Sequence, residues 1–173
     1  RRKQLYECDP NPAHHALARL EEKYDVHIIT QNVDDLHERA GSSKVLHLHG
    51  ELKKVRSQAD PDLIIELEGW ELKKGDTCPK GSQLRPHIVW FGEPVHMIGP
   101  AAEIAATADI LIVIGTSLKV YPAAGLVHYA PAESEKYYID PAAYENSMVS
   151  NLSVIREKAG IAMPGLADVL LNR

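Results

Sequence analysis

The apolar run Asp109–Ile114 (DILIVI) limits the possible folds more than any other segment of this chain. Isoleucine, leucine and valine follow one another without a polar face, and Gly115 ends the run. Such a segment is typical of a strand that is buried on both sides, and these strands occur in parallel sheets covered by helices. The run therefore predicts an α/β fold with a parallel sheet.

Further strands and helices alternate along the chain, as this fold requires. Asn11 and Pro12 are typical of a helix start, and Ala13, Ala16, Leu17 and Leu20 have helical spacing. We predict further strands over Val26–Thr30, Lys44–His49, Pro86–Phe91 and Lys136–Ile139 and near Val154. Later helices are predicted over Asp35–Ala40, Pro100–Ala108, Pro122–Tyr129 and Gly165–Leu171.

The segment Lys44–His49 alternates, with Leu46 and Leu48 on one face and Val45, His47 and His49 on the other. We expect Gly50 to end this strand. From Glu51 to Arg85 charge rises and regular periodicity fades, which predicts a small inserted lobe over 51–85. The main domain would comprise residues 1–50 and 86–173. We expect the lobe to be held by apolar packing around four residues: Leu63, Ile65, Leu67 and Trp70.

The composition excludes several classes of protein. A net charge of −5 with no basic stripe argues against a nucleic-acid binder. No apolar run approaches the roughly 20 residues that span a bilayer, and the two distant cysteines form no disulfide framework. No signal peptide is evident, so we expect a cytoplasmic enzyme without a membrane partner. Because the chain opens on Arg1 rather than Met, we expect the N-terminal part of the protein to be missing; removal of an initiator Met is the alternative.

Polar residues follow three of the predicted strands. They are the segments Thr30–Asp34, His47–Gly50 and Gly115–Ser117. The carboxyl ends of parallel strands lie at one edge of a sheet, where ligands bind. Amides, a carboxylate, an imidazole and hydroxyls suit a polar ligand such as a nucleotide ribose, but they do not specify a reaction.

Several segments then resemble consecutive motifs of the sirtuin family. These are PNPAHHAL (10–17), TQNVDDLHERAG (30–41), VLHLHGEL (45–52), RPHIVWFGE (85–93) and IGTSLKVYPAAGL (114–126). The chain resembles bacterial NAD-dependent protein deacylases, including the class with desuccinylase and demalonylase activity. The resemblance implies a Rossmann-like NAD-binding domain with helices on both faces of its sheet, NAD as cofactor, and an acyl-lysine protein or peptide as substrate.

The resemblance also implies roles for individual residues. His49 matches the family's general base, and an imidazole suits that task because its ordinary pKa lies near neutral pH. Asn32 matches a second catalytic residue. The positions implied to contact NAD are Gln31, Asn32, Val33, Asp34, Gly115, Thr116, Ser117, Tyr138, Ile139, Asp140 and Ala159. Those implied to contact the acyl-lysine substrate are Arg1, Val89, Trp90, Phe91 and Gly92, with Arg1 against an acyl carboxylate.

The sequence departs from the family pattern in two respects. Sirtuins usually hold a structural zinc with four cysteines, whereas the lobe here offers Cys78 alone, with Ser57 near the place of the first pair. We therefore expect no metal. The family's glycine-rich GAGxS segment, which supplies backbone N–H groups to the NAD pyrophosphate, is not among these residues. We therefore expect weak NAD binding and little turnover from these residues alone.

Alternatives stay open at this point. The chain could be a catalytically inactive NAD- or ADP-ribose-binding module, or an ADP-ribosyl transferase. Asp34 or Asp35 could simply cap the next helix. His47 could be structural, Trp90 and Phe91 could be core residues, and Arg1 could be a frayed terminal side chain.

Overall fold

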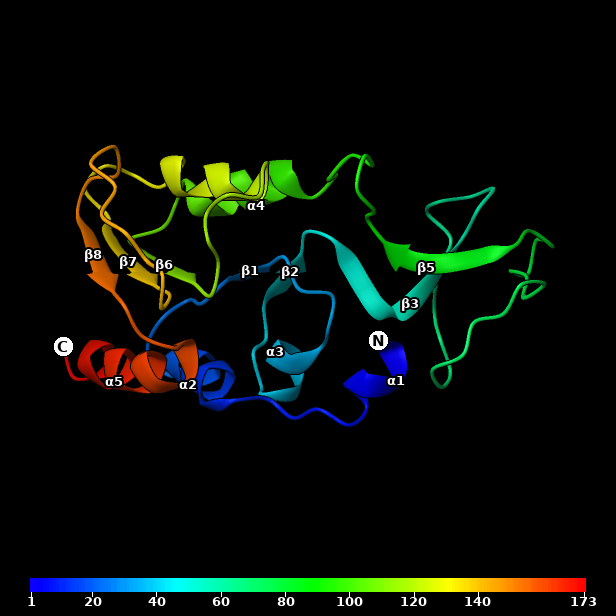
Figure 1. The fold of residues 1–173 in the computed structure, drawn as a ribbon, viewed down its shortest axis with the longest axis horizontal. Coiled ribbons are helices and arrows are strands. Elements are labelled where there is room, and N and C mark those ends of the chain that lie inside the picture. The colour runs from blue at the N-terminus through cyan, green and yellow to red at the C-terminus, as the bar shows by residue number, and fades with distance from the viewer.

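A computed structural model describes residues 1–173 and shows a layer of strands between two layers of helices, with a small sheet projecting from one end (Figure 1). No helix combines the length and the apolar character that crossing a membrane requires. In chain order the elements are α1 Arg2–Leu5, α2 Pro12–Leu20, β1 Ile28–Thr30, α3 Leu36–Arg39, β2 Val45–His47, β3 Gly50–Ser57, β4 Ile64–Glu66, β5 Leu84–Ile88, α4 Ile98–Ala105, β6 Ile110–Ile114, the 3-10 helix η1 Ala123–His128, β7 Glu135–Ile139, β8 Leu152–Ile155 and α5 Ala159–Leu171.

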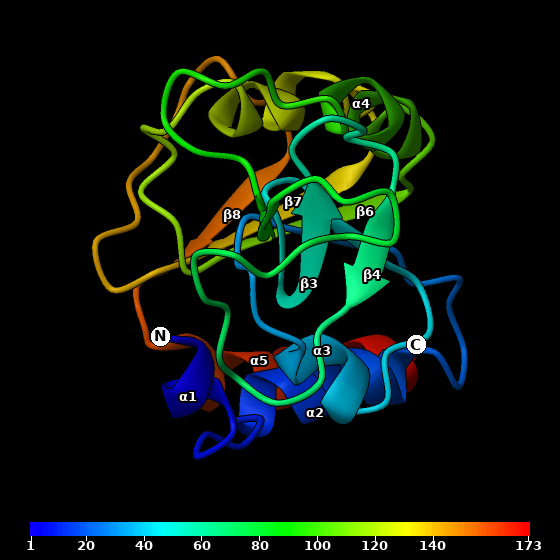
Figure 2. The same cartoon turned by 90° about the vertical axis from the view of Figure 1, so that its right-hand side faces the viewer.

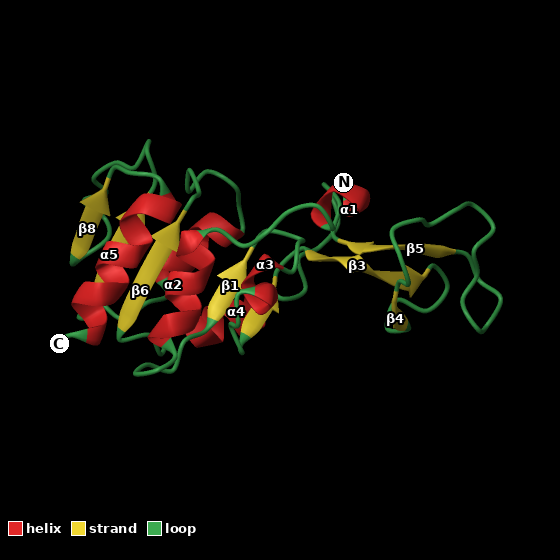
Figure 3. Cartoon of the chain, turned by 90° about the horizontal axis from the view of Figure 1, so that it is seen from below, coloured by secondary structure: helices red, strands yellow, loops and turns green.

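The central layer contains two parallel sheets. Strand β1 pairs with β2, with Ile28 opposite Val45, and the second sheet has the order β6-β7-β8. Both sheets rest on the same pair of helices, because Ile28 and Ile139 join residues of α2 and α5 in one apolar cluster. The arrows of β1, β6 and β8 point the same way, which confirms the α/β fold with parallel strands (Figure 3).

Helices cover both faces of the central layer, as the resemblance implied (Figure 2). On the second face Leu48 packs with Ala101 of α4 and Ala123 of η1, and Leu46 lies against this cluster. Val45 packs on the α2–α5 side instead. The predicted alternation of Leu46 and Leu48 against Val45 is therefore confirmed.

The boundaries of several helices differ from the prediction. Helix α4 spans 98–105 rather than 100–108. The segment predicted as a helix over 122–129 is a 3-10 helix over 123–128. Helix α5 begins at Ala159, not at 165. Pro164 lies inside α5, where it removes one backbone donor. Buried packing of Met163, Leu166, Ala167 and Leu170 outweighs that loss.

The projecting sheet has the antiparallel order β4-β3-β5. The bounds of two strands differ from the prediction here. Gly50 does not end the preceding strand: β2 stops at His47, and Gly50 opens β3. The predicted strand over 86–91 is β5 at 84–88, and it pairs with β3 rather than with the main sheet. The small sheet thus reaches beyond 51–85 on both sides, and the domain boundary itself stays a prediction.

The core of this lobe matches the expectation only in part, because Leu63, Ile65 and Leu67 are half-buried but Trp70 is not. Trp70 is 46% exposed, and the Lys3 ammonium lies 5.5 Å from the centre of its ring. The buried side chains are those of Val55, Ser57 and Cys78, and the Cys78 thiol donates to the Ser57 hydroxyl at 3.4 Å. Small buried residues between the strands, rather than a large aromatic, fill the lobe.

Gly50 lies where two backbones meet. Its φ is +81°, and a Cβ there would stand 2.0 Å from the carbonyl oxygen of His87. Gly75 also has a positive φ, +102°, but a Cβ there would meet nothing within 4 Å. A side chain at Gly75 would therefore cost only backbone strain, whereas a side chain at Gly50 would cost backbone strain and a steric clash.

We expect Gly50→Ala to lower the free energy of unfolding by about 2–4 kcal/mol, because strain and overlap with β5 add together. The control Gly75→Ala carries only the conformational cost, about 1 kcal/mol. Urea unfolding monitored by circular dichroism measures both. Equal effects of the two substitutions would contradict the close approach of Gly50 to β5.

Candidate active site

The loop Gln31–Asp34 leaves the carboxyl end of β1 and is held by its main chain. His49 bonds through Nδ1 to the carbonyl oxygen of Gln31 at 3.1 Å. His47 bonds through Nδ1 to the carbonyl oxygen of Asn32 at 3.3 Å. The backbone amide of Leu52 donates to the carbonyl oxygen of Val33 at 2.7 Å. Three consecutive carbonyls of the loop are therefore tied to the stretch from β2 to the start of β3.

The contact to Gln31 fixes the proton positions on His49. A carbonyl oxygen only accepts hydrogen bonds, so Nδ1 of His49 carries the proton. In the neutral ring the other nitrogen, Nε2, then holds a free lone pair. The half-buried His49 is thus oriented as a proton acceptor through Nε2.

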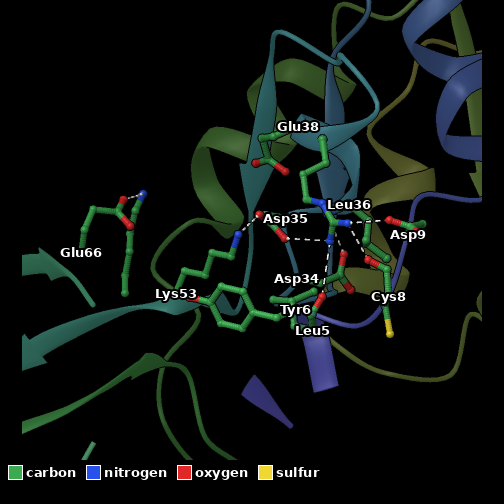
Figure 4. Close-up of polar contacts among 12 residues, drawn as sticks. Leu5, Tyr6, Cys8, Asp9, Asp34, Asp35, Leu36, Glu38, Lys53 and Glu66 are labelled. Atoms are coloured by element: carbon green, nitrogen blue, oxygen red, sulfur yellow. Dashed lines mark hydrogen bonds and ion pairs between the residues drawn. The ribbon is translucent and has the colours of Figure 1, made fainter. Parts of the chain in front are cut away.

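Hydrogen bonds within the loop give it a defined shape. The amide of Asn32 donates to the Thr30 hydroxyl at 3.0 Å. The Asp34 carboxylate accepts from the amide of Leu36 at 3.2 Å, at the start of α3. Asp34 therefore does have the helix-entry contact that the alternative interpretation proposed, whereas Asp35 makes no capping bond and instead pairs with Lys53 (Figure 4).

A second group of predicted residues follows β6 and β7. Gly115 has a φ of +62° and leads into Thr116, whose carbonyl accepts from the Tyr138 hydroxyl at 2.9 Å. Burial, together with the nearby Asp140 carboxylate, raises the pKa of Tyr138, so the phenol keeps the proton that it donates. Ile139, the next residue after Tyr138, is fully buried, and Ala159 is the first residue of α5.

These two groups lie at the same edge of the central layer, because every strand that precedes them runs in one direction (Figure 3). The edge carries amides, hydroxyls, carboxylates and one oriented imidazole. The polar groups of this edge therefore come from the ends of several strands and are not a single acid–base pair.

The segment Val89–Gly92 follows β5 and adjoins the first group, because the amide of Val89 donates to the carbonyl of His49 at 2.9 Å. Trp90 is half exposed and Phe91 fully exposed, so the alternative that they are core residues is wrong. Glu93 fixes this turn. Its carboxylate accepts from Arg85 at 2.7 and 3.2 Å and from the amide of Trp90 at 3.1 Å.

The Arg85–Glu93 pair was not found from the sequence. RPHIVWFGE contains both residues, but their contact depends on the turn that folds residue 93 back toward β5. Arg1 lies exposed before α1, and its side chain has no hydrogen-bond partner; the neighbouring Arg2 instead donates to carbonyls of Leu52 and Trp70.

One trio of side chains could offer atoms to a metal ion. Ligand atoms of Glu38, His47 and Glu51 lie within 4.8 Å of one another. Glu38 already pairs with His47 at 2.7 Å, and Glu51 with Lys54 at 2.8 Å. Both carboxylates thus already have partners inside the protein, and we assign no metal to the trio. The absence of a lobe zinc stays a prediction.

A family profile described as the Sir2 family matches residues 1–122. The chain belongs to the Sir2 family. It is 53% identical over 172 residues to an NAD-dependent protein deacylase of Helicobacter pylori strain 26695, covering 99% of this chain and 75% of that protein. A protein of the same name from Bacteroides thetaiotaomicron is 51% identical over 176 residues, with the same coverage of both chains.

Solved structures of the Sir2 family agree in fold. The complex of a Sir2 homologue with NAD superposes with a TM-score of 0.85 at 38% identity, covering 98% of this chain and 68% of that one. A complex of Sir2 with a p53 peptide and NAD+ gives 0.74 at 28% identity, covering 98% and 72%. The fold inferred from the sequence is therefore confirmed.

Glu93 offers a test of the turn. Its hydrogen bonds from Arg85 and from the Trp90 amide hold the pKa of the carboxyl below its usual value. A depressed pKa in the folded state adds stability at pH values above the unfolded-state pKa of about 4.3, and this is lost as pH falls through the folded value. We expect Glu93→Gln to lower the thermal midpoint near neutral pH. This difference from wild type should shrink progressively as pH falls below about 4.3 and vanish below the pKa of Glu93 in the folded protein. A difference in thermal midpoint that does not change with pH would contradict this role of the Glu93 carboxylate.

Proposed function

We propose that this chain is an NAD-dependent protein-lysine deacylase, in which His49 is the general base that acts at the carboxyl edge of the sheet. The family and the names of its relatives support this function. The observation that carries the proposal for the site is the hydrogen bond from His49 Nδ1 to the carbonyl of Gln31, which leaves Nε2 free to accept a proton.

The chemistry of the edge fits NAD. We infer that Gln31, Asn32, Val33 and Asp34 hold the ribose and nicotinamide side, since amides and a carboxylate suit hydroxyl and carboxamide groups. On the adenosine side we place the other group: Gly115, Thr116, Ser117, Tyr138, Ile139, Asp140 and Ala159. The open backbone at Gly115, where a Cβ would meet nothing within 4 Å, leaves room for close approach of a ligand.

Bound NAD would supply an electrophilic ribose carbon for the acyl oxygen of the substrate. With one water consumed, the products would be nicotinamide, the free lysine side chain and O-acyl-ADP-ribose. His49 would then accept a proton at Nε2 from a ribose hydroxyl. The imidazolium formed keeps its Nδ1 bond to Gln31, so the ring need not turn during the transfer. Asn32, one residue farther along the same clamped loop, would orient the ribose.

An acyl-lysine peptide would bind along the exposed segment of Val89, Trp90, Phe91 and Gly92. The main chain there is held by Glu93 and by the bond from Val89 to His49, so it offers a preformed edge to an extended peptide. The exposed Phe91 would lie against the acyl-lysine side chain. We also place the protein in the cytoplasm, as its composition indicates.

The reaction is tested by incubating the chain with NAD and an acetyl-lysine peptide and following O-acetyl-ADP-ribose by mass spectrometry. We expect His49→Ala to lower turnover at least about 100-fold, the contribution typical of a general base. His15→Ala, an exposed histidine on α2, is the matched control and should be indistinguishable from wild type.

Two results would favour other functions. Binding of ADP-ribose in calorimetry without any product would favour an inactive binding module. Nicotinamide release that does not require the acyl peptide would favour an ADP-ribosyl transferase.

We further propose that the chain removes succinyl and malonyl groups, with Arg1 as the partner of the acyl carboxylate. The exposed Arg1 has no partner of its own, and a guanidinium binds a carboxylate at two points. We expect Arg1→Ala to lower kcat/KM for a succinyl-lysine peptide about tenfold, roughly the strength of one charge-assisted pair, and to leave an acetyl-lysine peptide unaffected. Lys3→Ala, a neighbouring cation on α1, is the control. Equal losses with both peptides would contradict the role of Arg1.

A further inference from the structure

We propose that His47, held by Glu38, is a positioning residue that fixes the main chain of Asn32 for the reaction. This inference rests on the proposed function, because it gives His47 a task in presenting a residue of that active site. From the sequence alone His47 appeared structural, and no pattern connected it with Glu38.

Both hydrogen-bond partners of His47 are acceptors. Its Nδ1 lies 3.3 Å from the carbonyl oxygen of Asn32, and its Nε2 lies 2.7 Å from Oε1 of Glu38. A carbonyl oxygen and a carboxylate cannot donate, so both ring nitrogens must carry hydrogen for both bonds to exist. The His47 ring therefore bridges the loop and α3, with a hydrogen-bond acceptor on each side.

The surroundings favour this arrangement. The His47 side chain is only 8% exposed, which keeps water from replacing either partner. Glu51 of β3 faces the same group, but Lys54 balances its charge. On α3 burial lowers the pKa of His37, so this neighbouring ring stays neutral and does not compete for the Glu38 carboxylate.

Glu38 is itself presented by a fixed helix. Arg39 donates to the carbonyls of Leu5 and Cys8 and pairs with Asp9 at 3.0 Å. Asp35, one turn earlier, pairs with Lys53 of β3 (Figure 4). Helix α3 is thereby tied to the N-terminal segment on one side and to β3 on the other, so the carboxylate of Glu38 can hold the imidazole ring in place.

The consequence for the loop is local. If His47 carries one proton, only one of its two bonds can persist, and the carbonyl of Asn32 can lose its donor. The carbonyls of Gln31 and Val33 keep theirs, from His49 and from the Leu52 amide. Loss of the bond from His47 to the Asn32 carbonyl would therefore shift Asn32, while His49, the fold and the segment Val89–Gly92 stay in place.

The first test needs no substrate. Nitrogen-15 NMR of the full chain at neutral pH, with the His47 signals assigned by their loss in His47→Phe, reports how many ring nitrogens carry hydrogen. We expect both in wild type and in Glu51→Gln, and one in Glu38→Gln, where the balancing charge is removed. A singly protonated His47 in wild type would overturn the proposal, whatever the chain catalyses.

The second test separates positioning from stability. His47→Phe keeps an aromatic ring of similar volume but has no hydrogen-bond donors. We expect it to lower kcat about tenfold, a change in the barrier about as large as the contribution of one hydrogen bond. The KM for the acetyl-lysine peptide should be unchanged, because the peptide segment is not attached to His47. Glu51→Gln removes a neighbouring carboxylate that is not bonded to His47, and its kcat should match wild type.

Equal kcat in His47→Phe and Glu51→Gln, or a loss confined to KM, would refute the role. Should His47→Phe fail to fold, Glu38→Leu decides: leucine offers the ring no hydrogen-bond partner, so this variant should lower kcat without changing the peptide KM. A wild-type chain that turns over no acyl-peptide would count against the proposed function, while the nitrogen protonation would still decide the clamp.

Discussion

The close approach of Gly50 to the carbonyl of His87 is the constraint on which the site depends, because it lets β3 begin directly beside the end of β2. His47 and His49 precede this glycine by three and one positions, and Leu52 follows it by two. These three residues supply the donors for three consecutive carbonyls of the loop Gln31–Asp34. Any side chain at position 50 would push β3 away from β5 and move all three donors together.

The loop Gln31–Asp34 is held through its backbone carbonyls, so its side chains stay free for chemistry. The loop's conformation is set by donors outside it, so Gln31 and Asn32 need not use their amides to hold their own main chain. The same principle applies at Val89–Gly92, where Glu93 and Arg85 fix the turn and leave Phe91 exposed. Apart from His49, the residues that pre-organise both segments need not touch a ligand, and they limit the reorganisation that the reaction requires.

The sequence predicts the parts of this protein that local pattern determines. The apolar run at 109–114, the alternation of Leu46 and Leu48, and the Asn11–Pro12 helix start were all recovered, because each follows from the spacing of neighbours. Position 50 was misjudged because a glycine between two strands has the same local pattern whether it ends one or opens the next. The contacts Glu38–His47 and Arg85–Glu93 could not be predicted, since they depend on how a helix or a turn folds back on a strand. Trp70 was wrongly placed in the core because hydrophobicity alone does not distinguish a buried ring from one that covers a surface cation.

Strand β3 connects the lobe to the candidate active site mechanically. Its first residues hold the loop through Leu52 and pair Lys53 with Asp35, while its later residues Lys54–Ser57 form the centre of the lobe sheet. Helix α1 strengthens the same junction, because Arg2 donates to Leu52 and Trp70, and the Tyr6 hydroxyl donates to Gly69. A rotation of the lobe would therefore pull on the carbonyl of Val33 through a single residue, Leu52. In this architecture the stiffness of a sheet outside the nucleotide-binding layer contributes directly to the position of the residues that we assign to catalysis.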